Sequence, residues 1–146
     1  MPEEKLPAIM RDFVKTMEDG DVEKTLGYFT EDAVWVNPSG AARGKSGLRR
    51  YMEWMYGQMK DTRVKECGNG IIVQGNKGFF EHEISGTMKG KRVAVLAMCA
   101  YEFEGDKIKE VRTTFDRLSM GQQAATGCLP RMMLNMIVRQ SEKGLH

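Results

Sequence analysis

The sequence has few cysteines and no long hydrophobic run. Cys67, Cys99 and Cys128 are widely spaced, and none belongs to a CxxC or a Cys/His spacing of the zinc type. An odd number of cysteines without a paired framework is typical of a reducing compartment. No segment approaches the roughly 20 apolar residues that cross a bilayer, and Met1–Lys5 does not begin like a signal peptide. We therefore expect a cytoplasmic protein without a metal site.

The sequence also has no large excess of positive or negative charge. The 22 basic and 20 acidic residues give a net charge of +2, which argues against nucleic acid or a membrane surface as partner. Nucleotide motifs are absent too, because the phosphate-loop-like segment 40–46 has three residues between its glycines instead of four. We expect no cofactor.

The 146 residues suit a single domain over 1–146, with a core of about 5–120 and a helical extension of about 121–146. Apolar residues recur every three or four positions over 3–18, 46–59 and the segment after Pro130, which predicts three helices. Asp21 is a suitable cap for a further short helix that reaches Tyr28.

From Arg63 onward, apolar and polar residues alternate with a period of two, which is typical of strands. We expect a short strand over 32–37 and longer strands over 63–74, 77–88, 92–104 and 107–118, joined by turns that favour antiparallel hairpins. Gly68-Asn69-Gly70 predicts a bulge. Because segment 92–104 is apolar on both faces, we expect a partner subunit on its outer face, and hence a homodimer.

Helices on one face of a bent antiparallel sheet form an α+β cone with an open, apolar end. Twelve methionines, many of them on helix stripes, would give this cone an adaptable lining. We therefore expect a small apolar ligand.

Asp116 is the first candidate for chemistry. If the last strand alternates through Leu118, then Arg112, Thr114, Asp116 and Leu118 share one face, and Asp116 points into the cone. Desolvation there would raise its pKa and suit it to acid/base catalysis. The alternative is a structural ion pair with Arg112.

Glu81, His82 and Glu83 form the second candidate group. Glu83 shares a face with Glu81, where the two carboxylates can mark a wet cavity mouth or lie near Asp116. His82 shares the other face with apolar residues, either as a packed histidine or as a base. A one-residue bulge would exchange the two faces.

Asn37 ends an apolar strand on the face of Trp35. Its amide can orient water or a carbonyl, or it can simply form the turn before Pro38. Tyr51 on the helix over 46–59 offers a hydrogen-bond donor to the pocket.

Several short motifs resemble the nuclear-transport-factor-two-like superfamily, and within it the SnoaL-like group. They are Gly20-Asp21, Tyr28–Trp35, Gly44 at a helix start, Gly90 in a hairpin, Glu104–Ile108 and Phe115-Asp116. The resemblance covers about residues 5–120. It implies a cystatin-like α+β barrel, which is often dimeric, around an apolar pocket. For this chain Phe13, Trp35, Tyr51, Met55, His82 and Arg112 would bind the substrate.

Three enzyme branches of the superfamily compare differently. Ketosteroid isomerases carry catalytic residues where this chain has Phe13, Asn37 and Cys99, so that activity is not expected. Polyketide cyclases resemble the chain in an aspartate that matches Asp116. Limonene-epoxide-hydrolase-like enzymes resemble it in Asn37 and Asp116. In that comparison Glu83 stands for a second aspartate, while Trp35 replaces a tyrosine and Glu81 replaces an arginine.

The leading hypothesis is a cofactor-independent enzyme of the cyclase or isomerase type, with Asp116, Asn37 and Glu83 as catalytic residues. Epoxide hydrolysis is the alternative chemistry. A non-catalytic module for a hydrophobic ligand, and a protein-interaction domain built on the C-terminal methionine-rich helix, are alternatives from other classes.

Overall fold

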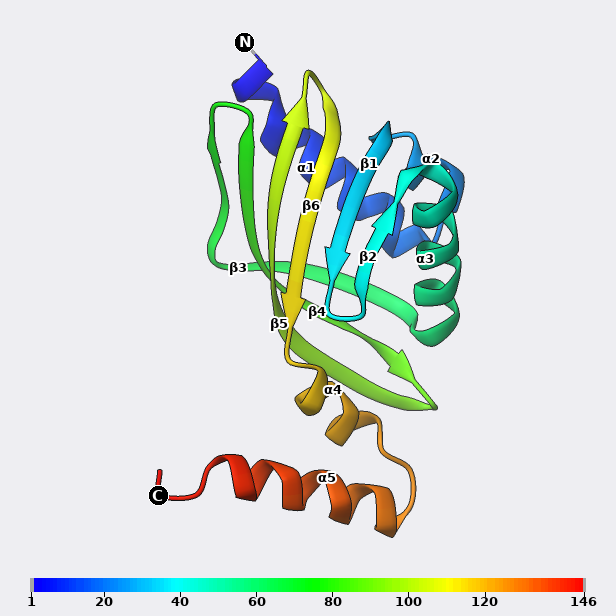
Figure 1. Cartoon of the computed structure of the whole chain (residues 1–146), viewed down its shortest axis with the longest axis vertical. Coiled ribbons are helices and arrows are strands. Elements are labelled where there is room, and N and C mark those ends of the chain that lie inside the picture. Colours follow the sequence, from blue (N-terminus) through cyan, green and yellow to red (C-terminus); the bar gives the residue numbers. More distant parts are fainter. Residues whose placement is uncertain (1, 146) are drawn as a thin grey trace.

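Three helices cover one side of a strongly curved sheet (Figure 1). They are α1 (Pro2–Asp19), α2 (Val22–Leu26) and α3 (Gly44–Gln58). The structure is a computed structural model that describes residues 2–145. None of the helices within this range is both long and apolar enough to cross a membrane.

The sheet has six strands in the order β2-β1-β6-β5-β4-β3. Their bounds are Phe29–Asn37 for β1, Gly40–Arg43 for β2, Lys60–Gln74 for β3, Lys77–Met88 for β4, Lys91–Glu104 for β5 and Lys107–Phe115 for β6. β1 and β6 are parallel, and the other neighbours are antiparallel. The predicted α+β cone with an antiparallel-dominated sheet is therefore confirmed.

The first helix is fixed by its apolar stripe and its ends. Leu6, Met10 and Phe13 lie on one face of α1 and are at most 1% exposed. Gly20 follows the helix with φ +68°, a conformation that favours glycine. Asp21 then caps α2 as predicted, since its Oδ1 accepts a 3.0 Å hydrogen bond from the Lys24 amide.

Irregularities in two strands decide which side chains face inward. The register of β3 and β4 shifts between Glu66 and Ile71, which confirms the predicted bulge around Gly68–Gly70. In β6, Ile108 pairs with Phe103 and Glu110 pairs with Glu102, so Lys109 is an extra residue. This second bulge changes the parity of every later residue in β6.

The chain beyond β6 differs from the prediction. The strand ends at Phe115 instead of Leu118, and α4 (Arg117–Ala124) follows it. Gln123 holds α4 against β5, because its side-chain amide donates to the Ala94 carbonyl at 3.0 Å and accepts from the Ala94 amide at 2.9 Å. The amide thereby continues the sheet beyond the pairing of β5 with β6, which begins at Ala97.

A final helix, α5 (Cys128–Ser141), lies beyond the end of the barrel and packs on α4 (Figure 1). It begins before Pro130, where the sequence had placed its start. β2 was not predicted, because Gly40–Arg43 contains no β-branched or aromatic residue and was interpreted as a loop.

Candidate functional site

The sheet and the helices enclose a cavity of about 180 Å³ with an almost entirely apolar lining. The sheet contributes Trp35, His82, Ile84, Cys99 and Thr113, α1 contributes Phe13 and Met17, α3 contributes Tyr51, Trp54 and Met55, and α4 contributes Met120. None of the lining residues that the structure describes is an aspartate or a glutamate. The cavity therefore offers neutral groups only.

A chain of hydrogen bonds crosses the sheet side of the cavity. The Trp35 indole Nε1 donates to Thr113 Oγ1 at 2.9 Å, and Thr113 Oγ1 lies 3.3 Å from Cys99 Sγ. Cys99 also hydrogen-bonds with the Tyr101 side chain. Burial raises the pKa of the Cys99 thiol to about 11 and that of the Tyr101 phenol well above its usual value, so both remain protonated. Trp35, Thr113, Cys99 and Tyr101 thus supply one another's hydrogen-bond partners.

Tyr51 lines the cavity and has an unpaired hydroxyl. It packs edge-on against Trp35, with ring centroids 5.2 Å apart. No hydrogen bond joins its hydroxyl to any other residue within 2–145. Since every fully buried side-chain nitrogen or oxygen in that range has a partner, the hydroxyl retains accessible surface. Burial, reinforced by the nearby Cys99, raises the pKa of Tyr51 to about 12. The phenol is therefore an available neutral donor.

His82 is 6% exposed and lines the same cavity from β4. Its ring stacks on Phe80 with centroids 4.4 Å apart, and Nδ1 lies 3.4 Å from the Phe80 carbonyl oxygen. Because a carbonyl only accepts, this contact favours a proton on Nδ1 and a lone pair on Nε2. Burial lowers the pKa of His82, so the ring is neutral near pH 7. Nε2 has no partner among the described residues and retains accessible surface.

Five of the six residues expected to bind the substrate line this cavity: Phe13, Trp35, Tyr51, Met55 and His82. The sixth, Arg112, does not. It is exposed, and its guanidinium lies 2.8 Å from Glu110 on its own strand. The bulge at Lys109 is the reason, because it turns Thr113 and Phe115 toward the cavity and leaves Arg112 and Thr114 on the outer face.

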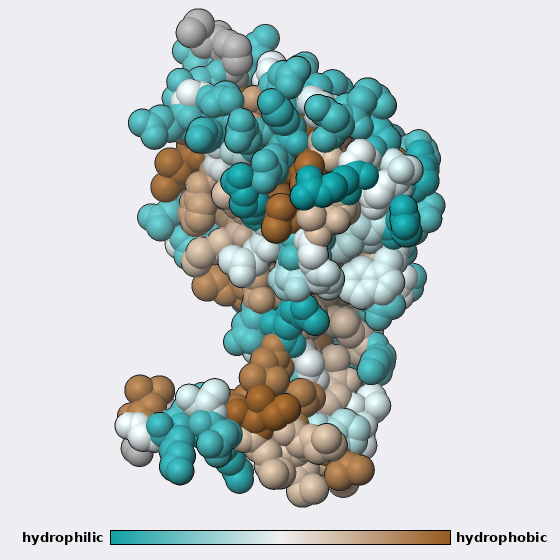
Figure 2. Space-filling model, in the orientation of Figure 1, coloured by the Kyte–Doolittle hydropathy of each residue, from teal (hydrophilic) through white to brown (hydrophobic). Residues whose placement is uncertain are grey.

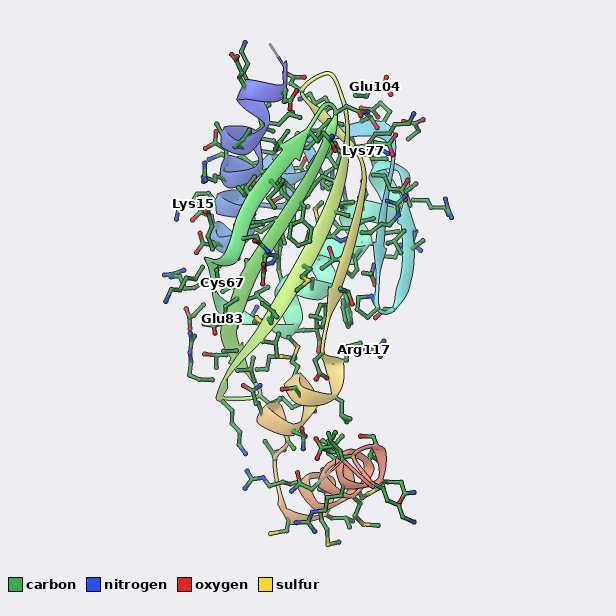
Figure 3. The ribbon with its side chains drawn as sticks, turned by 90° about the vertical axis from the view of Figure 1, so that its left-hand side faces the viewer. Lys15, Cys67, Lys77, Glu83, Glu104 and Arg117 are labelled. Carbon is green, nitrogen blue, oxygen red and sulfur yellow. The ribbon has the colours of Figure 1, made fainter. Side chains whose placement is uncertain are left out.

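Asp116 does not point into the cone. The residue is exposed, and its Oδ1 accepts a 2.9 Å hydrogen bond from the Ser119 amide as the cap of α4. Figure 3 shows the neighbouring Arg117 at the junction of β6 and α4. The alternative, an ion pair between Asp116 and Arg112, is also absent from the described residues, where Arg112 instead pairs with Glu110. The strand interpretation failed here because the Asp116 side chain caps a helix. An aspartate whose carboxylate accepts from the amide three residues later marks a helix N-terminus.

The other two predicted catalytic residues lie outside the cavity as well. Asn37 forms the turn after β1, since its Oδ1 accepts from the Ser39 amide at 2.8 Å. It borders a shallow surface hollow between the β1–β2 hairpin and α3. Glu83 is exposed on the outer side of β4 (Figure 3). Glu81 accepts from the backbone and side chain of Asn69 at 2.8 and 3.1 Å, so it supports the bulge of β3.

Sequence reasoning missed the contributions of Thr113, Tyr101 and Met120 to the cavity. Threonine and tyrosine are ordinary strand residues, so no local signal distinguished the first two. The capping pattern at Asp116 was the available signal for α4, which brings Met120 over the cavity.

A cone of helices and curved sheet around one apolar cavity defines a protein of the nuclear-transport-factor-two-like fold. The SnoaL-like domain family matches residues 10–111, well over half of the chain. The chain therefore belongs to the SnoaL-like family. Comparison with curated proteins gives no significant match.

Solved structures support the fold at low sequence identity. A hypothetical protein with a ketosteroid isomerase-like fold from Catenulispora acidiphila, in complex with trimethylamine, aligns with a TM-score of 0.73 and 15% identity over 80% of this chain and 91% of that one. A limonene-epoxide-hydrolase-like epoxide hydrolase from Mycobacterium tuberculosis aligns with a TM-score of 0.72 and 16% identity, over 94% of this chain and 99% of that one. An NTF2-like protein from Burkholderia xenovorans aligns with a TM-score of 0.67 and 18% identity, over 84% of this chain and 98% of that one.

Proposed function

We propose that this chain binds a small, largely apolar carbonyl compound and moves a proton within it, as cofactor-independent isomerases and cyclases do. One observation carries the proposal: a neutral imidazole and an unpaired phenol line the same apolar cavity. The catalytic pair is thus His82 and Tyr51, in place of the carboxylates expected from the sequence.

The cavity volume limits the substrate. About 180 Å³ corresponds to about six water molecules at about 30 Å³ each. This room suits a single-ring molecule better than a multi-ring one. The aromatic and methionine lining would bind its apolar body, and Met17, Met55 and Met120 can adapt to its shape.

The reaction balances without a redox partner. Nε2 of His82 takes a proton from the carbon next to the carbonyl, and the C–H electron pair forms the enolate. The Tyr51 hydroxyl donates a hydrogen bond to the enolate oxygen, where negative charge develops. The imidazolium then returns the proton to another carbon of the same molecule, as in an isomerase. In the cyclase branch the enolate carbon attacks a second carbonyl carbon of the same molecule, whose C=O electron pair moves onto its oxygen, and the imidazolium protonates the resulting alkoxide. A dry cavity strengthens the hydrogen bond to the oxygen.

Epoxide hydrolysis is supported less well. It would need a held water and carboxylates, and the described lining has neither Asn37 nor any carboxylate. A non-catalytic ligand-binding module remains the competing function, because the same cavity would bind the same ligands without turnover. Trimethylamine, which the Catenulispora protein binds, belongs among the ligands to screen, since aromatic rings attract cations.

The test is deuterium exchange into small cyclic ketones, followed by proton NMR in heavy water. We expect the wild type to accelerate exchange at the carbon next to the carbonyl. His82→Gln should reduce the enzyme-dependent rate by about 100-fold or more, and Tyr51→Phe by about 100-fold. Tyr28→Phe is the matched control, because Tyr28 does not line the cavity. The exchange rate of this variant should equal that of the wild type.

Two results would contradict acid/base catalysis. A ketone that stabilises the wild type in a thermal shift but exchanges no faster with protein would indicate the binding module. Exchange that survives His82→Gln undiminished would remove His82 from the reaction.

A further inference from the structure

The surface hollow that Asn37 borders is a second concave space, outside the apolar cavity. It lies between the β1–β2 hairpin and α3 and has a volume of about 560 Å³. Gly40, Ala42 and Gly47 are among its lining residues and leave room for a ligand. Figure 2 colours the surface on the side of β2 and α3 mostly from hydrophilic to neutral, in contrast with the brown patches over α5. This surface suits a small soluble ligand better than a large apolar partner.

The charged side chains of the hollow are both positive. Arg43 and Arg50 line it, and none of the described residues that line it is an aspartate or a glutamate. Neither guanidinium forms a hydrogen bond or an ion pair with another residue within 2–145. A guanidinium can hold a carboxylate through two parallel N–H···O bonds. The hollow therefore has unmatched positive charge that fits a carboxylate.

Glu53, an acidic residue three positions after Arg50 on α3, does not line the hollow. Hydrogen bonding to Glu23 raises the pKa of Arg49, and the charge of Glu53 adds to this effect. The ion pair with Glu23 places Arg49 on the side of α3 that faces α2. Arg50 instead lies on the side toward the β1–β2 hairpin. The charge of Arg50 is therefore available to a ligand in the hollow.

The hollow and the apolar cavity meet at two aromatic side chains. Among the described residues, Tyr51 and Trp54 line both spaces. Their rings stack with centroids 6.0 Å apart. Tyr51 also packs against Trp35, whereas Trp54 is 53% exposed. Trp54 is therefore the less constrained part of the boundary, and a turn of its ring would join the hollow to the cavity.

We propose that the substrate is a keto acid that binds across this boundary. Arg50 holds its carboxylate in the hollow, Trp54 turns aside for its ring, and its ketone oxygen lies beside Tyr51 in the cavity. Side chains one turn apart on a helix, such as Arg50 and Trp54, have Cβ atoms about 5–6 Å apart, so a single-ring molecule can reach both. The ketone end of this arrangement rests on the function proposed above, and the carboxylate end does not. Arg50 is then the residue that selects anionic over neutral ketones.

Calorimetric titration of the full chain with two ketones of the same size tests the anion site. The ligands are 3-oxocyclohexanecarboxylate and its neutral amide, 3-oxocyclohexanecarboxamide. We expect the wild type to bind the carboxylate about tenfold more tightly than the amide, because a hydrogen bond to a charged acceptor is stronger than one to a neutral acceptor. Arg50→Gln should remove this difference by weakening the binding of the carboxylate alone.

The neighbouring Arg49 provides the matched control. Arg49→Gln removes the same charge from the same helix outside the hollow, so the preference for the carboxylate should remain. Tyr51→Phe tests the ketone end. It should weaken 3-oxocyclohexanecarboxylate about threefold and leave the affinity for cyclohexanecarboxylate, which has no ketone, unchanged. Circular dichroism checks that each variant is folded.

Three results would overturn the proposal. Equal affinity of the wild type for carboxylate and amide, or binding of neither, removes the anion site. A preference that survives Arg50→Gln, or that Arg49→Gln also abolishes, belongs to other charges. A keto acid whose affinity does not change in Tyr51→Phe does not reach the cavity.

These binding measurements do not depend on turnover. Deuterium exchange into neutral ketones can therefore succeed while the keto acid proposal fails. Conversely, a preference for the carboxylate that disappears in Arg50→Gln, without exchange into any ketone, would support the anion site and contradict the catalytic proposal.

Discussion

Trp35 and Thr113 are joined by a 2.9 Å hydrogen bond from the indole Nε1 to Oγ1, across two strands 78 residues apart in sequence. Trp35 is 3% exposed, so water cannot readily replace Thr113 as the acceptor. The bond fixes the ring that forms the cavity wall beside Tyr51.

We expect Thr113→Val to lower the free energy of unfolding by about 1–3 kcal/mol, because the buried indole N–H loses its acceptor while the side chain keeps its shape. Urea denaturation monitored by tryptophan fluorescence measures the change. Thr113→Ser retains the oxygen and should cost clearly less than the valine variant. A valine variant that loses less stability than the serine variant would mean that the methyl group, not the hydroxyl, matters.

Acid should destabilise the protein through His82. Burial places the pKa of folded His82 below its ordinary value of 6.5, so the unfolded chain binds a proton more readily. The stabilisation by the neutral ring is complete above pH 6.5 and is lost as the pH falls through the folded pKa. The free energy of unfolding of the wild type should therefore decrease from pH 7 to pH 5 more than that of His82→Gln. Parallel pH profiles for the two proteins would contradict this assignment.

Asp116 should matter for stability and not for turnover. Asp116→Ala removes the cap of α4 and should cost about 1 kcal/mol, while Asp116→Asn retains a capping oxygen and should cost less. Both variants should catalyse deuterium exchange as fast as the wild type, measured with the ketone assay above. A large loss of rate in Asp116→Asn, with normal stability, would restore the aspartate mechanism expected from the sequence.

Two glycines should respond to alanine with opposite signs. A Cβ at buried Gly86 would lie 2.9 Å from the Lys60 carbonyl oxygen and would also meet Met59, so Gly86→Ala should destabilise by about 1–3 kcal/mol. Gly57 in α3 has no atom within 4 Å of such a Cβ, so Gly57→Ala should stabilise by about 0.5–1 kcal/mol. Thermal denaturation of the pair checks both. A destabilising Gly57→Ala would show that this turn of α3 needs glycine.

Most of the fold could be predicted because its signals are local. The stripes of α1 and α3, the glycine turns between β3 and β6 and the bulge near Gly68 each depend on a few neighbouring residues. Lys109 is the opposite case. Nothing in its residue type marks a bulge, and yet it decides that Thr113 faces the cavity and Arg112 does not.

The site was predicted in part for the same reason. Alternation in β4 set His82 opposite Glu81 and Glu83 but left open which face meets the pocket, and in the structure His82 lines the cavity together with Tyr51 from α3. Asp116 and Arg112 lie beyond the bulge, where counting by twos gives the wrong face. The Tyr51 hydroxyl and Nε2 of His82 are unpaired because of how the whole cavity packs, which no single segment of the sequence specifies.

The position of α4 couples the cavity to the C-terminal helix. Met120 on α4 lines the cavity, Gln123 fastens α4 to Ala94, and Gln122 joins it to Asn135 on α5. By thermodynamic linkage, any factor by which the docking of α5 on α4 changes the affinity of the cavity for its ligand is the factor by which the ligand changes that docking. A ligand dissociation constant that changes when Gln122→Ala removes the bond to Asn135 would be the signature of this coupling.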